Sequence, residues 1–248
     1  MLLYGSLAVC GILAALLVYR YDMYEREPWY MIVVAIGLGW GAMWLAGLAE
    51  TWTMNLFGEP PRPDVIVAAI AATHEELARL LVVIGLAIFL PRQFNDPMDG
   101  IIYGSIVGVG MAIDESLFFL GLGADPAAPL PPAEVIRIAG HLVMGGITGF
   151  AIGMARMSLK GWPRVLAVCL VVSIGMHFLW DCVAFAAGRQ GAMTPWQTAA
   201  AVCLMLGGIL FYGVLVVVGS EWSRQVFAPH STKSLWGWPF TLLRKPGR

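Results

Sequence analysis

Seven long apolar runs decide what this chain can fold into. A transmembrane helix needs about 20 consecutive, mostly apolar residues to cross the hydrocarbon core of a bilayer. The chain has seven runs of about this length, and 59% of its residues are hydrophobic while only 12% are charged. The runs cover residues 1–19, 29–49, 64–90, 99–122, 134–156, 165–187 and 197–219. We therefore expect an all-α fold, a polytopic membrane helix bundle of about seven transmembrane helices, and we exclude a soluble globular domain.

The runs and their short connectors leave little room for a second domain. We predict a single transmembrane domain at residues 1–219 and a cytoplasmic tail of basic and aromatic residues at 220–248. The first run has no basic residue before it and no small-residue cleavage site after it. We therefore expect a retained helix there and not a signal peptide.

The basic residues predict the orientation in the membrane. Lys and Arg concentrate on the cytoplasmic side of membrane proteins. With seven spans, eleven of the fifteen Lys and Arg residues fall on one side, three fall on the other, and Arg79 falls inside the membrane. This bias predicts that the N-terminus lies outside and that the C-terminus is cytoplasmic.

A small set of ionisable residues lies inside four of the predicted spans. Such a residue costs a few kcal/mol in hydrocarbon unless it is paired or hydrated, so it is a functional hypothesis by default. Counted from the outer ends of the spans, one group of them lies about 9 to 17 Å deep, in one layer of the outer half of the bilayer. The residues of this layer are Glu75, Glu76, Glu115, His141, His177 and Asp181. Four helices would have to meet at one polar cavity to produce it.

Helical spacing adds local detail to this layer. Arg79 follows Glu75 by four residues and Glu76 by three, so it can reach either carboxylate. Adjacent Glu75 and Glu76 point about 100° apart on a helix, and we expect them to have different roles. His177 and Asp181 share one face, which predicts that Asp181 orients His177. A buried Glu76–Arg79 pair with a purely structural role is the alternative.

Glycine recurs at every fourth position in two of the spans. The positions are 100, 104 and 108 in one span and 145, 149 and 153 in the next. Small residues at this spacing let helix backbones approach closely in membranes. We interpret these glycines as packing signals that carry no chemistry.

The segment HEELA at 74–78 comes close to a helical zinc motif. The motif HExxH needs a second His four residues after the first, and position 78 is Ala. A two-His zinc site on one helix is therefore excluded. Any metal would have to collect its ligands from several helices.

Five segments, taken in order, are similar to the motif blocks of the PrsW family. They are YEREPW at 24–29, EELAR at 75–79, MDGIIYGSIVGVGMAIDES at 98–116, GHLVMGGITGFAIGMAR at 140–156 and MHFLWD at 176–181. Arg79 stands at the Lys or Arg position of the family's EExxK/R motif, and Met111 stands where Phe is usual. His74 has no counterpart. The resemblance runs from about residue 20 to residue 185 and leaves out the last span and the tail.

The resemblance implies an intramembrane endopeptidase of a bacterial cell membrane, distantly related to the CAAX-protease and bacteriocin-processing superfamily. It implies as substrates membrane-anchored proteins with a single span, such as anti-sigma factors, cut near the outer face. The partners are thus a membrane protein and the lipid bilayer, with no nucleic acid. The essential positions of the family fall on Glu75, Glu76, His141 and His177, and Glu115 and Asp181 lie in matching blocks.

We expect a carboxylate to activate water in this site. Glu75 or Glu76 would take a proton from water, while His141 and His177 would stabilise the oxyanion or protonate the leaving amine. With a divalent metal such as zinc, Glu76, His141 and His177 would be the ligands and one position would stay open for water. The related prenyl endopeptidases are argued to work without a metal, so both mechanisms stay open.

Two other classes of membrane protein also fit parts of the pattern. An ion-coupled transporter buries Glu, Arg and His near the midplane. Transporters often have internal repeats, however, and HEELAR at 74–79 has no counterpart in the second half of the chain. A scaffold that binds a partner helix would use the glycines but has no need for a layer of acids and histidines.

Overall fold

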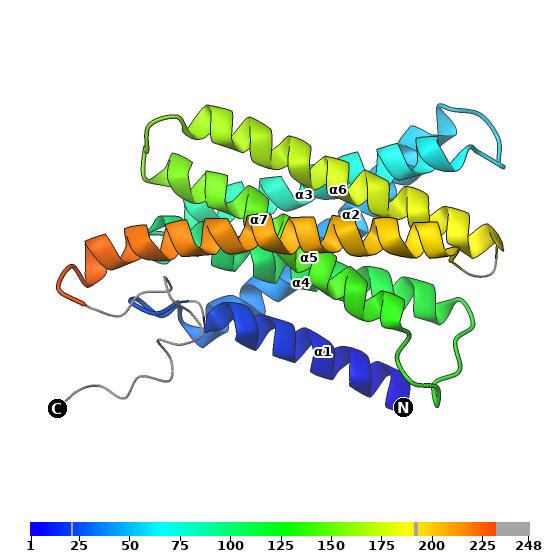
Figure 1. Cartoon of the computed structure of the whole chain (residues 1–248), viewed down its shortest axis with the longest axis horizontal. Coiled ribbons are helices and arrows are strands. Elements are labelled where there is room, and N and C mark those ends of the chain that lie inside the picture. Colours follow the sequence, from blue (N-terminus) through cyan, green and yellow to red (C-terminus); the bar gives the residue numbers. More distant parts are fainter. Residues whose placement is uncertain (21, 191–192, 232–248) are drawn as a thin grey trace.

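The computed structural model describes residues 1–20, 22–190 and 193–231, and every regular element in this part of the chain is a helix (Figure 1). The helices are α1 (Leu2–Tyr19), α2 (Trp29–Asn55), α3 (Asp64–Phe89), α4 (Pro97–Gly121), α5 (Pro132–Arg156), α6 (Trp162–Gln190) and α7 (Pro195–Phe227). The predicted all-α fold is confirmed.

Six of the helices in the described residues are long and apolar enough to cross a membrane, and α3 is the exception. The 26 residues of α3 are long enough, at about 39 Å, but they include Glu75, Glu76 and Arg79. A polytopic helical membrane protein is therefore confirmed, while its orientation stays a prediction. Helices α2 and α7 run furthest past the expected ends of their spans, to Asn55 and to Phe227. Most of the predicted tail, 232–248, lies outside the described residues.

Helices α4 and α5 form the centre of the bundle. In each of them 72% of the spanning residues are buried, against 22–33% in the other four spanning helices. A Cβ atom on Gly104 would lie 2.2 Å from the carbonyl oxygen of Gly145, and one on Gly149 would lie 1.9 Å from that of Gly100. No side chain fits in such a space, so the two backbones touch. The predicted packing role of the glycines is confirmed.

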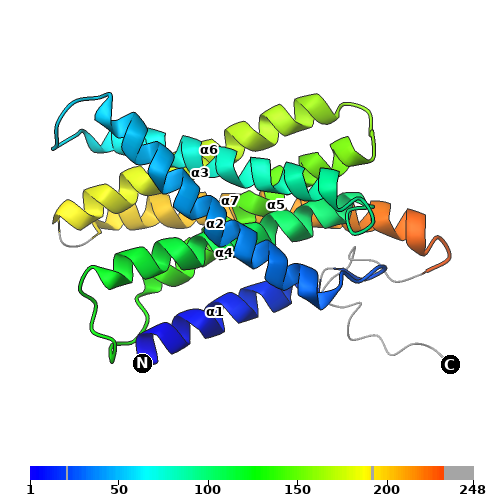
Figure 2. The same ribbon diagram turned by 180° about the vertical axis from the view of Figure 1, so that it is seen from behind.

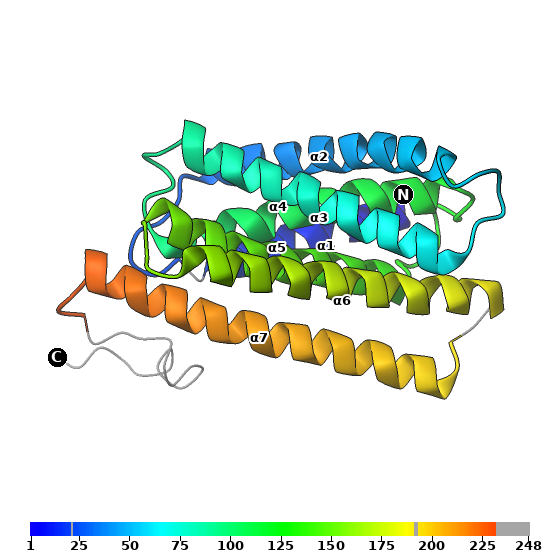
Figure 3. The ribbon, with the colours of Figure 1, turned by 90° about the horizontal axis from the view of Figure 1, so that it is seen from above.

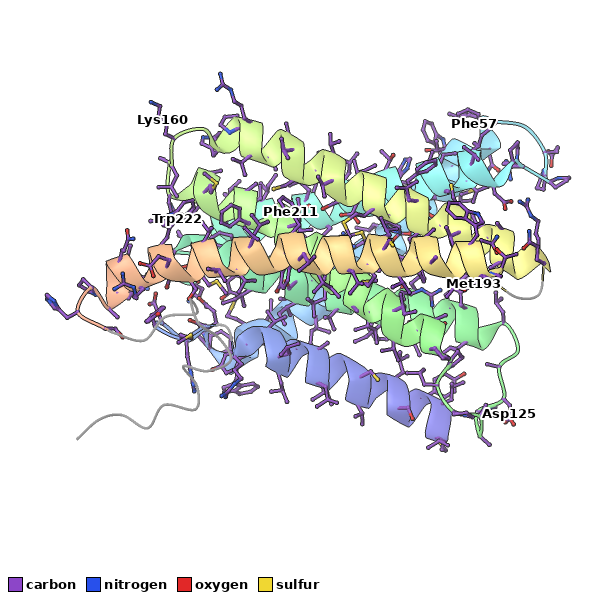
Figure 4. The ribbon with its side chains drawn as sticks, viewed as in Figure 1. Phe57, Asp125, Lys160, Met193, Phe211 and Trp222 are labelled. Atoms are coloured by element: carbon purple, nitrogen blue, oxygen red, sulfur yellow. The ribbon has the colours of Figure 1, made fainter. Side chains whose placement is uncertain are left out.

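The remaining helices surround this pair. Figure 2 shows α2 crossing α4 obliquely, and Figure 3 shows α2 and α7 on opposite faces of the bundle with α4 and α5 between them. Figure 4 marks the two ends of the bundle. Phe57, Asp125 and Met193 mark the connectors after α2, α4 and α6 at one end, and Lys160 marks the α5–α6 connector at the other. The N-terminal ammonium donates to the carbonyl oxygen of Pro126 (2.6 Å), so the N-terminus lies at the Asp125 end.

A group of buried carboxyl groups holds the other end of α4. The side chain of Asp96 accepts from the backbone of Asp99 (3.0 Å), and Asp99 accepts from the backbone of Asp96 (2.7 Å), which closes a capping box at the helix start. Glu27 accepts from the Tyr103 hydroxyl, and Asp22 accepts from the backbone of Glu27 (2.6 Å). The α1–α2 connector is thus fastened to the first turns of α4.

Candidate active site

All seven predicted site residues lie in one connected cluster, in which each side chain is in polar contact with at least one other member. Helix α3 contributes three of them, α6 contributes two, and α4 and α5 contribute one each. The residues are Glu75, Glu76, Arg79, Glu115, His141, His177 and Asp181. The expectation that four helices meet in one polar layer agrees with this geometry.

Arg79 decides how the two glutamates differ. Its guanidinium forms an ion pair with Glu76 and also donates from Nη2 to His141 Nδ1 (2.8 Å). Glu76 accepts in addition from His177 Nδ1 (3.1 Å). The side chains of both Glu76 and Arg79 are fully buried. Arg79 therefore neutralises Glu76 and not Glu75, although the spacing along the helix allowed either.

The same contacts fix the hydrogen on each imidazole. Arginine has only donors, so Nδ1 of His141 is an acceptor and the hydrogen of its neutral ring lies on Nε2, 3.0 Å from Glu115 Oε2. The carboxylate of Glu76 is an acceptor, so His177 carries a hydrogen on Nδ1, and in the neutral ring Nε2 has the lone pair. At Nε2, His141 is thus a hydrogen-bond donor, and the neutral ring of His177 is an acceptor.

Glu75 makes no hydrogen bond to another member of the cluster. Its side chain is buried, and Oε2 has no hydrogen-bond partner in the described residues. This oxygen lies 3.6 Å from Nε2 of His177 and 3.8 Å from Nε2 of His141. The two imidazole rings meet edge to face, with 5.2 Å between their centroids. Glu75 Oε2 therefore lies near Nε2 of both His141 and His177, but too far from either for a direct hydrogen bond.

The donor set suits a divalent metal such as zinc. Glu75, His141 and His177 offer ligand atoms within 4.8 Å of one another, and tetrahedral zinc separates its ligand atoms by about 3.3 Å. Glu75 has an unused oxygen, and His177 has a free Nε2 with a carboxylate behind Nδ1, as metal-bound histidines usually do. To bind a metal through Nε2, His141 would need its ring hydrogen on Nδ1. Nδ1 could then no longer accept from Arg79 and would have to donate to another group.

This candidate ligand set differs from the one expected from the sequence. Glu76 was the expected carboxylate ligand, but Arg79 and His177 occupy its two oxygens. Glu75 takes its place in the group of possible ligands.

Asp181 also lies differently from the expectation. It faces His177 from the Nε2 side at 3.7 Å, while Glu76 holds the Nδ1 hydrogen of that ring. Glu76 is therefore the partner that orients His177, and Asp181 adds a carboxylate on the side where Glu75 lies.

Two further charged residues border the site and were missed from the sequence. Arg137 contacts Glu115 (3.1 Å from Nε to Oε1), forms an ion pair with Glu134 and lies 4.7 Å from the ring centroid of Phe119. Glu50 has a buried oxygen without a partner, and it lies close enough to His177 and Glu115 for their charges to act on it. Extending the second apolar run past 49, as the helix in fact extends, would have found Glu50.

His74, which sequence reasoning could not place, has a local role. One ring nitrogen, Nδ1, contacts the carbonyl oxygen of Ile70 (2.8 Å), and the other, Nε2, contacts the hydroxyl of Thr53 (3.0 Å). His74 thus ties α3 to α2 and stays outside the cluster.

A helical membrane bundle with carboxylates and imidazoles buried together defines a polytopic membrane protein with an enzyme-like site inside the bilayer. Comparison with known sequences identifies the kind of enzyme. The family described as PrsW family intramembrane metalloprotease matches residues 27–219, which include all seven site residues. The chain belongs to the PrsW family and is an intramembrane protease.

Individual relatives agree with the family. The chain is 28% identical to Protease PrsW of Bacillus subtilis (strain 168) over 68% of its own length and 77% of that protein. It is 26% identical to Protease PrsW of Geobacillus kaustophilus (strain HTA426) over 71% of its length and 78% of that protein. No solved structure gives a significant match. The protein is therefore an integral protein of a bacterial cell membrane that acts on a membrane protein, and the transporter and scaffold alternatives are set aside.

Proposed function

We propose that this protease cleaves single-span, membrane-anchored proteins of the anti-sigma-factor type, and that Glu75 activates the attacking water. The observation that carries the proposal is Oε2 of Glu75, which makes no hydrogen bond to a described residue and lies 3.6 Å from Nε2 of His177 and 3.8 Å from Nε2 of His141. A general base needs a free lone pair beside the reacting water, and in this cluster Glu75 offers one.

Glu76 is unsuited to be the base. Arg79 binds one of its oxygens and His177 Nδ1 binds the other. Its role is to hold the His177 ring so that the Nε2 lone pair faces Glu75. Glu76 is thus a positioning residue, and Arg79 balances its charge.

The reaction then uses one water molecule. Water donates one hydrogen to Glu75 Oε2 and the other to Nε2 of His177, which aims an oxygen lone pair at the scissile carbonyl carbon. As the new C–O bond forms, Glu75 takes the proton. The N–H of His141 Nε2, which faces Glu115 in the free protein, turns from it and donates to the carbonyl oxygen as that oxygen becomes negative. Glu75 then passes its proton to the leaving amine as the C–N bond breaks, which regenerates the carboxylate.

A divalent cation would be held by Glu75, His141 and His177. It would supply Lewis acidity toward the scissile carbonyl. With a cation bound, these three side chains would serve as its ligands, and Glu76 and Arg79 would support them from behind.

The predicted orientation supports cleavage near the outer face. The N-terminus and the connectors after α2, α4 and α6 share one end of the bundle, and the bias of basic residues assigns that end to the outside. Glu115 lies about 9 Å from the end of α4 at this side, so the site would lie nearer the outer face.

The test is cleavage of a single-span reporter by purified protein in proteoliposomes. We expect Glu75→Gln to lower the rate by about 100- to 10,000-fold, because a neutral amide cannot take the proton. The melting temperature should stay near the wild-type value, because Glu75 Oε2 makes no hydrogen bond within the described residues that the variant would break. Glu59→Gln, on the exposed α2–α3 connector, is the matched control and should keep full activity. Full activity in Glu75→Gln would refute the role of Glu75.

A further inference from the structure

A small cavity adjoins the two imidazoles, and none of its lining residues belongs to α3. It lies where α5, α6 and α7 meet, and its volume is about 20 Å³. His141 and His177 form one part of its wall. The cavity is also lined by Gly140, Met144, Met176, Trp180, Leu204 and Met205.

The position of the cavity decides what can enter it. A substrate whose scissile carbonyl lies against Nε2 of His141 places its neighbouring side chains within a few ångströms of both rings. The cavity is the hollow next to these rings, so its occupant in the complex is a side chain that flanks the scissile bond. This step rests on the proposed function.

The lining decides the chemistry of that side chain. Apart from the imidazoles and Arg137, the wall is isoleucine, methionine, leucine, tryptophan and glycine. Arg137 is already paired with Glu115 and Glu134. A charged side chain would lose its water there against a mostly apolar wall, whereas an apolar one loses nothing.

Gly140 and the methionines set the size limit. A cavity of about 20 Å³ holds roughly one water molecule, since about 10–15 Å³ is the minimum for one. A Cβ atom on Gly140 would lie 3.6 Å from Cε of Met205 and 3.9 Å from Cε of Met144, which is ordinary contact. A methyl-sized group therefore fits as the structure stands. A larger side chain needs the flexible Met144, Met176 and Met205 to change rotamer.

We propose that this cavity is the specificity subsite of the protease and receives one small apolar side chain from a residue that flanks the scissile bond. Gly140 keeps it open, and Met205 on α7 limits its depth. Helix α7 thereby has a direct part in choosing the substrate.

The test compares reporters that differ at one position. The bond cut in the single-span reporter is located by mass spectrometry, and each flanking residue is changed to Ala, Leu or Asp. At one of the two positions the wild type should cut the Ala reporter best, the Leu reporter more slowly and the Asp reporter least. One methylene in an apolar pocket commonly changes kcat/KM by about 10-fold or more.

Two variants should shift the preference in opposite directions. Met205→Ala deepens the cavity and should raise the ratio of Leu to Ala cleavage by about 10-fold. Gly140→Val fills it and should lower that ratio by a similar factor. Gly207→Val is the matched control, because Gly207 lies exposed on α7 with no atom within 4 Å of its Cβ position, and it should leave the ratio unchanged.

The outcomes separate this proposal from the proposed function. If the wild type cuts the reporters but Met205→Ala keeps the same ratio, the subsite is refuted and the protease mechanism stands. If the wild type cuts no reporter, the proposed function fails first. Because Gly140 adjoins His141, complete loss of activity in Gly140→Val leaves Met205→Ala as the deciding variant.

Discussion

Glu75 and Glu76 are neighbours in the sequence, yet their side chains have opposite surroundings. Glu76 is fully buried and bound by Arg79 and His177, whereas the buried Glu75 keeps an unpaired oxygen. The sequence predicted that they differ, because adjacent residues on a helix point apart. It could not assign the roles, because Arg79 reaches either glutamate by spacing alone. The choice depends on His177, which α6 brings to Glu76 from about 100 residues away.

Glu76→Gln should destabilise the protein, unlike Glu75→Gln. Removing one charge of a fully buried ion pair leaves Arg79 uncompensated, which typically costs about 3–5 kcal/mol. We expect a clear drop in the melting temperature of Glu76→Gln in detergent, measured beside Glu75→Gln under the same conditions. Equal melting temperatures for the two variants would contradict the assignment of Arg79 to Glu76.

Helices α4 and α5 are the elements that set the geometry of the site. Their glycines bring the backbones into contact, and the same contact places Gly108 of α4 against the carbonyl oxygen of His141. The glycine spacing predicted close packing in both spans but not that they pack on each other. The apolar pattern also ended the second span at 49, because hydropathy cannot show that α2 continues to Asn55 and carries Glu50.

Gly104→Ala should destabilise the protein by about 1–3 kcal/mol or more, because overpacking forces the two backbones apart. The new Cβ would lie 2.2 Å from a backbone oxygen, which cannot move aside as a flexible side chain can. Gly85→Ala on α3 is the control, since its Cβ position has no neighbour within 4 Å and alanine favours a helix by about 0.5–1 kcal/mol. Thermal melting of the two variants checks the expectation, and an unchanged midpoint in Gly104→Ala would contradict backbone contact.

The whole molecule carries ionisable groups at two separate levels. Asp99 precedes Glu115 on α4 by sixteen residues, so the acid group at the start of α4 lies about 24 Å from the candidate site. The layer of site residues could be predicted from depth along the spans. The second group could not, because Asp22 and Glu27 lie in a connector that reads as an ordinary polar loop. Their burial depends on how the connector folds onto α4.

This second group should make stability depend on pH. Burial, helped by the nearby charges of Glu27 and Asp96, raises the pKa of Asp22 from 3.8 to about 7, although the hydrogen bond from the backbone of Glu27 opposes the change. The folded protein therefore keeps a proton that the unfolded chain has already released above about pH 4. By linkage, this contribution to stability is complete below the unfolded pKa and is lost as the pH rises through about 7.

Asp22→Asn should remove that dependence while keeping an oxygen that accepts from the backbone of Glu27. We expect the wild-type melting temperature to fall between pH 5 and pH 8 by a few degrees more than that of Asp22→Asn. At pH 8 the variant should be the more stable protein, because its side chain is neutral at every pH. Glu59→Gln, on an exposed connector, should follow the wild-type curve. If Asp22→Asn and the wild type change in parallel across this range, Asp22 is not the group that holds the proton.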